Sequence, residues 1–341
     1  ALGGIVVAGA VYCLMSLVVR LVCVERVRSF FPPVVTGPVI VVIGMTLAPT
    51  GIAMASSNWW IALVVLAVII VVSVFCRGFF KLVPVLIGLA TGYLLSIVLD
   101  LFHVFPQPLV NFDFITNAAW VNPVWDFSGS FFVLPQFEWK SILLIAPVAF
   151  VTFMEHIGDI TTNGSVVGKD FFKDPGLHRT LLGDGLATLV AGCLGGPANT
   201  TYSENTGVLA VTRVYDTVVI KIAAFFAIGL GLFGKFGGVL QGIPDAVKGG
   251  MSIMLFGMIA AIGMRTLAEA KLDFTHSRNL IIVGLVLVFG LGMSSGVQIG
   301  DITISGLFIA VVAGAAANKI LPKEMDENSD TEQEPLEQKE K

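Results

Sequence analysis

Two acidic residues stand within strongly apolar parts of the sequence. Glu155 lies in the apolar run 148–159, and Glu204 follows an interrupted run at 195–201. A charged side chain at membrane depth costs at least about 2.5–3.5 kcal/mol on insertion scales, so it normally marks a substrate or proton pathway. The alternative is a carboxylic acid that hydrogen-bonds between helices. Two such residues on either side of a helix break favour the pathway.

The residues around Glu155 are spaced for one face of a helix. Thr152, Glu155 and Asp159 stand at positions i, i+3 and i+7. Burial and a neighbouring like charge both favour the protonated carboxyl, so Glu155 or Asp159 is a candidate for proton exchange. His156 points about 100° away from Glu155. We expect it to be packed or hydrogen-bonded to a neighbouring helix, and we keep it as a third candidate for proton coupling.

Glu204 stands at the first turn of the helix that follows the interruption. Free backbone N–H groups at such a helix start favour an anion or a polar acceptor. Ser203 or Thr201 could cap this helix, and Asp184 could cap the preceding short span. A carboxylate here can accept paired N–H donors from a planar heterocycle while backbone N–H groups bind its carbonyl oxygens. Glu155, Glu204, Ser203 and Tyr202 are the candidate substrate-binding residues.

The composition requires a membrane around these residues. Of 341 residues, 55% are hydrophobic and 13% charged, with a mean hydropathy of +0.88, whereas soluble domains are about 25% charged. The four cysteines are not at metal-ligand spacing. The sequence has no basic patch, phosphate-binding loop or Ser-His-Asp arrangement. It therefore gives no sign of nucleic-acid binding, a metal, a cofactor or an enzyme.

Apolar segments long enough for helices recur along the chain. We predict eleven spans, near 2–24, 33–54, 59–76, 82–102, 141–162, 181–196, 203–213, 215–236, 244–264, 279–297 and 302–320. Two of them, 181–196 and 203–213, are short and flank a segment rich in glycine, proline and asparagine. Irregular backbone at membrane depth survives only beside protein or a water-filled cavity. Such an interruption is the best sequence indicator of a transporter's binding site.

Lys and Arg cluster in alternate loops, which predicts the orientation of the spans. The positive-inside rule places the richer loops and the polar tail 322–341 in the cytoplasm, and the loop 106–140 outside. The tail is expected to be disordered. Eleven spans that end inside begin outside, so we expect an odd number of further spans before Ala1.

One sequence run resembles a family signature. The run from Glu204 to Arg213, with Asn205, Gly207 and Thr212 in place, resembles the signature of the nucleobase–ascorbate transporter family, also called nucleobase:cation symporter-2. That signature reads Gln/Glu-Asn-x-Gly, four residues, then Thr-Arg. The stretches 155–158, 169–179 and 198–202 resemble the family as well. The resemblance runs from residue 1 to about 320, and within the family it is to the bacterial uracil carriers.

The resemblance implies an all-α polytopic fold. The family has fourteen segments in two inverted seven-segment repeats, arranged as a core and a gate domain, with two short extended strands at broken helices. The chain would hold about eleven segments and lack three. The core would comprise 1–24 and 141–238, and the gate 33–105 and 244–321.

The resemblance also implies roles for single residues. Glu155 and Glu204 would hold the base, and an acid rather than Gln at 204 resembles the uracil carriers. Asn205 and Thr212 would order the broken helix. The sequence departs from those carriers at Ser203, where many have Gly, and at Asp159, where some have a His linked to proton coupling.

The function implied is proton-coupled uracil uptake by alternating access in the cell membrane, by a multi-pass protein. Its partners would be uracil, a proton, the lipid bilayer and, in a homodimer, a second copy. Two alternatives stay open: a carrier of xanthine or another purine, and a sulfate-like anion carrier of related fold. Two acids in the pocket argue against an anion. A channel or scaffold would leave the buried acids unexplained.

Overall fold

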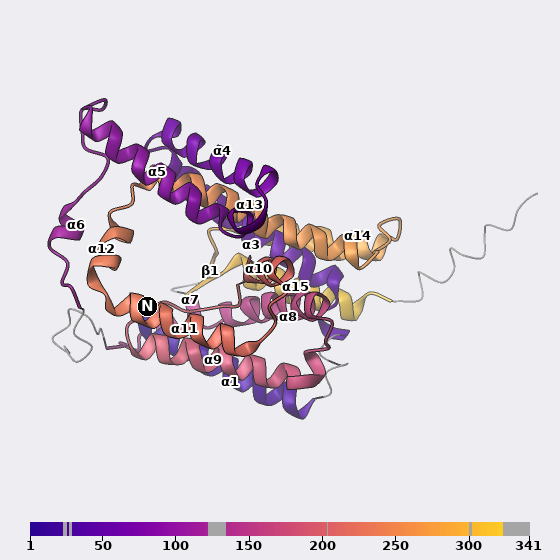
Figure 1. Ribbon diagram of the computed structural model, residues 1–341. Helices are drawn as coiled ribbons and strands as arrows, with labels where there is room; N and C mark the ends of the chain where they lie inside the picture. Colours follow the sequence, from indigo (N-terminus) through magenta and orange to yellow (C-terminus); the bar gives the residue numbers. More distant parts are fainter. Residues whose placement is uncertain (23–25, 27–28, 122–133, 203, 300–301, 323–341) are drawn as a thin grey trace, which may run out of the picture.

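The structure, a computed structural model, describes residues 1–22, 26, 29–121, 134–202, 204–299 and 302–322. Helices dominate it (Figure 1). Their bounds are α1 Leu2–Leu21, α3 Pro33–Ala55, α4 Trp59–Phe75, α5 Pro84–Leu101, α6 Asp113–Thr116, α7 Trp139–Ile145, α8 Val148–Val167, α9 Leu177–Cys193, α10 Glu204–Thr212, α11 Thr217–Leu232, α12 Gly234–Gln241, α13 Asp245–Glu269, α14 Ser277–Gly292 and α15 Gly306–Ile320. The predicted all-α polytopic fold is confirmed.

Five helical stretches of the described residues are long and apolar enough to cross a membrane: α1, α3, α5, α7 with α8, and α13. A sixth is added if α11 and α12, which are bent by 82° at their junction, form one span. The helices α4, α14 and α15 are apolar but shorter. The predicted span 141–162 is longer in the structure and is divided before Pro147, which has no N–H to continue the helical bonding.

The helices that carry the predicted chemistry pack against one another. Helix α1 lies along α9 and also contacts α7 and α8, and α10 contacts α8. Close approach of α1 and α9 requires glycine: a Cβ on Gly9 would lie 2.6 Å from the backbone nitrogen of Leu189. Small residues at such crossings let helix backbones meet, which is the usual basis of helix association in lipid.

The remaining long helices form a second group. Helix α3 packs against α13 and α14, α4 packs against α5 and α13, and α14 packs against α15. The α3–α13 contact also depends on glycine, because a Cβ on Gly263 would lie 2.6 Å from the backbone nitrogen of Val41. In Figure 1, α4, α5 and α13 lie on one side of the molecule, α1 and α9 lie on the other, and α8 lies between them.

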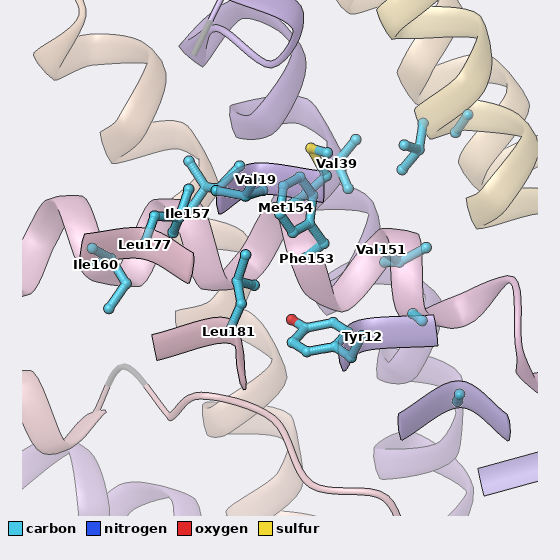
Figure 2. Packing of buried hydrophobic residues seen from close by; sticks show 14 of the residues in the cluster. Tyr12, Val19, Val39, Val151, Phe153, Met154, Ile157, Ile160, Leu177 and Leu181 are labelled. Atoms are coloured by element: carbon cyan, nitrogen blue, oxygen red, sulfur yellow. The ribbon is translucent and has the colours of Figure 1, made fainter. Parts of the chain in front are cut away.

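Helix α8 lies at the centre of the largest apolar core. Its Phe153 and Met154 are buried together with Tyr12 of α1, Leu181 of α9 and Val39 of α3 (Figure 2). Val39 comes from the second group of helices, so the core joins the two groups. Burial of this kind fixes which face of α8 is apolar and therefore where its polar residues point.

Two short strands lie between α14 and α15. Strand β1, Val297–Ile299, pairs antiparallel with β2, Ile302–Ile304, and Gln298 stands opposite Thr303. The predicted span 302–320 therefore begins as a strand, and its helix starts at Gly306. These are not the strands predicted at broken helices, because they form a hairpin between α14 and α15. In the described part of the interruption before α10, no residue is assigned to a strand.

Candidate functional site

The predicted interruption between the two short helices is confirmed. Helix α9 ends at Cys193, Gly195 adopts a positive φ of 87°, and the Gly196 amide bonds back to the carbonyl of Ala191 at 2.7 Å. The backbone then runs without regular structure to Tyr202, and α10 begins at Glu204. An irregular segment between two apolar helices needs side-chain partners for its polar groups.

Asp184 supplies two of those partners. Its Oδ1 accepts a hydrogen bond from Asn199 Nδ2, and its Oδ2 accepts one from Thr201 Oγ1, both at 3.3 Å. Thr188 also holds Asn199, because its Oγ1 donates to the Asn199 carbonyl at 3.1 Å and contacts the side-chain oxygen. The prediction that Asp184 caps its helix is wrong, since α9 begins at Leu177 and Asp184 lies in its middle. Thr201, a predicted cap of α10, instead binds α9.

His156 joins the same network from α8. The residue is 3% exposed, its Nε2 lies 2.9 Å from Thr180 Oγ1, and its Nδ1 lies 2.7 Å from Thr201 Oγ1. Nδ1 also lies 3.3 Å from Asp184 Oδ2. The expectation that His156 bonds to a neighbouring helix is confirmed.

The two hydroxyls beside His156 also bond elsewhere. Thr180 donates to the Leu177 carbonyl, and Thr201 donates to Asp184. From its place on α8, the ring of His156 therefore contacts both α9 and the interruption.

Glu155 lies at the edge of this network, half-buried. Its Oε2 accepts a hydrogen bond from Thr200 Oγ1 at 3.2 Å, so it contacts the irregular segment directly. Asp159, one turn further along α8, is 3% exposed. Tyr12 of α1 is buried nearby, with its ring edge-on to that of His156 and the two ring centroids 6.3 Å apart. The predicted polar face of α8 is present.

Helix α10 carries the signature residues. Ser203 and the side chain of Glu204 lie outside the described residues, so the predicted pairing of Glu204 with Glu155 stays a prediction. Tyr202 is 51% exposed. At the other end of the helix, Thr212 Oγ1 donates to the Val208 carbonyl at 2.8 Å.

Two other signature residues are exposed on α10, and a third follows the last residue of the helix. Asn205 and Gly207 are exposed on α10. Arg213 follows the helix in a left-handed conformation, with φ of 55°. A residue of this conformation after the last turn commonly terminates a helix.

The roles of several residues in the network were not predicted. Thr180, Asp184 and Thr188 stand four residues apart, so they share one face of α9. That spacing is a sequence signal for a polar stripe facing the interruption. Tyr12 gave no signal, because it stands in an apolar helix where an aromatic residue is ordinary packing.

The arrangement can bind a polar molecule but gives no sign of a metal. Among the described residues, no three His, Cys, Asp or Glu side chains gather as a metal site. Two open hollows lie elsewhere: one of about 410 Å³ beside Asp113 and Gln241, and one of about 490 Å³ beside Asn58 and Pro108. Neither touches Glu155. At the interruption lies a half-buried carboxylate, Glu155, which is hydrogen-bonded to the irregular segment that leads into α10.

Known proteins resemble this chain over most of its length. A family model described as "Permease family" matches residues 1–299. The uracil permease of Bacillus subtilis (strain 168) is 40% identical over 352 residues, which cover 97% of this chain and 78% of that protein. The probable uracil permease of Haemophilus influenzae is 39% identical over 335 residues, 96% of this chain and 77% of that protein. The uracil permease of Escherichia coli (strain K12) is 38% identical over 331 residues, 94% of this chain and 74% of that protein.

Proposed function

The chain belongs to this permease family, and we propose that it takes up uracil across the cell membrane by alternating access, coupled to proton entry. Its family and its apolar helices make it a multi-pass membrane protein. The observation that carries uracil as the substrate is the identity of about 40% to proteins named uracil permease, over nearly the whole chain. The site is consistent with that substrate.

Glu155 and Glu204 are the proposed ligands of the base. Uracil presents N–H donors beside carbonyl acceptors along one edge. A carboxylate accepts from the N–H groups, and backbone N–H groups at the start of α10 can bind a carbonyl oxygen. The hydrogen bond from Thr200 to Glu155 supports this role, because it ties the carboxylate to the segment that leads into α10. Ser203 and Tyr202 complete the proposed pocket.

Glu155, Asp159 and His156 are the proposed groups for proton coupling. Asp159 is almost fully buried one turn from Glu155, so full ionisation of both would place two like charges close together in a dry region. Binding a proton removes that repulsion. His156 and Asp184 are joined directly, so a proton gained or lost there would change the hydrogen bonds of Thr201 in the interruption.

The two helix groups are the proposed moving parts. We assign 1–24 and 141–238 to the core domain and 33–105 and 244–321 to the gate domain. The packing supports this division, because α1 packs along α9, whereas α3 packs along α13 and α14. Alternating access would then be movement of one group against the other around a fixed site.

The test is uptake of radiolabelled uracil by cells that lack their own uracil carrier. We expect saturable uptake, competition by excess unlabelled uracil but not by sulfate, and loss of uptake when the proton gradient is collapsed. Stronger competition by xanthine than by uracil would identify a purine carrier instead. Uptake that survives collapse of the proton gradient would refute the proton coupling but not the uptake of uracil.

Glu155→Gln tests the binding role. A hydrogen bond to a charged group is worth about 1.5–3 kcal/mol, so its loss raises the KM for uracil about tenfold to 150-fold. Glu269→Gln is the matched control: Glu269 pairs with Arg265 on an exposed helix end at 2.6 Å, and exposed pairs of this kind contribute little. An unchanged KM in Glu155→Gln would remove Glu155 from the site.

A further inference from the structure

Helix α10 is anchored by one buried hydroxyl. Thr206 is 5% exposed, and its Oγ1 donates a hydrogen bond of 2.8 Å to Asn163 Oδ1 on α8. Among the α10 residues whose side chains are described, no other is fully buried, and Asn205, Gly207 and Thr212 are exposed. A nine-residue helix with so little burial has few other contacts to fix its position.

Asn163 lies on the helix that carries the proposed ligands. It is four residues after Asp159 and eight after Glu155, so it is about 12 Å from Glu155 along the axis of α8 at 1.5 Å per residue. Nearer Glu155, the irregular segment is attached to the same helix through Thr200 and Thr201. The irregular segment and α10 are therefore hydrogen-bonded to α8 at two separate positions along its axis.

We propose that Asn163 is a positioning residue that sets the distance between α10 and α8, and with it the width of the proposed uracil site. Thr206 stands two residues after Glu204, so displacement of Thr206 from Asn163 moves the first turn of α10. The backbone N–H groups of that turn move with it, relative to Glu155. The inference rests on the proposed function, because it assigns Asn163 to the binding of the same substrate.

Uptake kinetics test the effect on binding. In Thr206→Val and in Asn163→Ala, we expect KM for uracil to rise about fivefold to tenfold, as for loss of one net hydrogen bond, with the maximal rate changed less than twofold. Thr206→Ser keeps the donor and should restore the unmodified KM. The double variant should be no worse than either single variant, because the two changes remove the same bond. Thymine is uracil with one added methyl group, so a wider site should accommodate it better. In Thr206→Val and Asn163→Ala, inhibition of uptake by thymine should therefore weaken less than inhibition by unlabelled uracil.

A matched control separates this bond from other hydroxyls of α8. Thr161 Oγ1 donates to the Ile157 carbonyl of its own helix at 2.8 Å, so Thr161→Val removes a hydroxyl without releasing α10. Its KM should stay at the unmodified value. An unchanged KM in both Thr206→Val and Asn163→Ala overturns the inference.

A second measurement needs no substrate. Spin labels are placed at Gly207→Cys, where a Cβ would meet no atom within 4 Å, and at the exposed Ser165→Cys on α8, with the native cysteines replaced. We expect Asn163→Ala and Thr206→Val to lengthen or broaden the distance between labels, and Thr206→Ser and Thr161→Val to leave it unchanged. An identical distance in all variants overturns the inference. If the unmodified protein takes up no uracil, the proposed function fails, and the label distances alone decide whether Asn163 holds α10.

Discussion

Asp184→Asn is the change that tests the polar network most directly. The two side chains have nearly the same shape, so packing is preserved and only charge and hydrogen bonding change. Asp184 accepts from Asn199 through one oxygen, and it meets Thr201 and His156 through the other, each at 3.3 Å. An asparagine has one oxygen and one NH2 group, so it cannot accept on both sides.

The loss can be estimated from these contacts. If the amide oxygen faces Thr201, the NH2 group faces the donor Asn199 Nδ2, and one bond to a charged acceptor is lost. Such a bond contributes about 1.5–3 kcal/mol, and the distance of 3.3 Å is at the long end of the range, which favours the lower figure. The contact of 3.3 Å between His156 Nδ1 and Asp184 Oδ2 also loses its carboxylate. We therefore expect the ratio kcat/KM for uracil uptake to fall about tenfold.

The assay is the initial rate of radiolabelled uracil uptake against uracil concentration, at equal amounts of protein in the membrane. Asp216→Asn is the control, because Asp216 accepts from the Val218 amide at the start of α11, and asparagine caps a helix as well as aspartate does. A ratio within twofold of the unmodified protein in Asp184→Asn would show that this network does not order the interruption. A parallel loss in Asp216→Asn would point to general sensitivity to carboxylate removal.

Three further outcomes follow from the packing and the loops. Gly9→Val should separate α1 from α9 and lower the melting temperature of the purified protein by several degrees, because a Cβ there lies 2.6 Å from a backbone nitrogen. Arg278→Ala should lower the free energy of unfolding by about 1.5–3 kcal/mol in denaturant melts, because the guanidinium of Arg278 donates to both oxygens of Asn318 at 2.9 and 2.7 Å. The hydroxyl and then the amide of Thr275 hold the pKa of Asp273 below its ordinary value of 3.8. Protection of the Thr275 amide from hydrogen exchange should thus persist well above that pH and disappear as the pH falls through the lowered pKa, whereas in Asp273→Asn it should not vary in this way.

The sequence predicts most of the fold because a membrane restricts it. A spanning segment must be apolar and helical, so hydropathy alone places α1, α3, α5 and α13 within a few residues. The polar face of α8 was also predictable, since Thr152, Glu155 and Asp159 can share a face only in a helix. The interruption before α10 follows from its adjacent glycine and proline residues, which together disfavour a continuous helix.

The partners of the interruption could not be predicted in the same way. Hydropathy treats Asp184 as a polar residue near the end of a span, and only the path of the chain beyond Cys193 brings Asn199 and Thr201 back to it. Asn163 has a weak signal, because it stands four residues after Asp159 on the predicted face. Its partner Thr206 has no such sequence signal. The path of the chain before a short helix decides which side of that helix is buried.

Helix α8 links the proposed binding step to the proposed movement. It carries Glu155 and Asp159, and it also contacts α3 of the second helix group. Gly158 stands between the two acids in sequence, and a Cβ there would lie 3.2 Å from Ile40 Cδ1. The groups therefore meet within one helical turn of the residues proposed to bind uracil and a proton. A change of charge at Asp159 therefore acts on a helix that already contacts the second helix group. Binding of uracil and a proton can then affect the position of the gate domain without a long chain of intervening contacts.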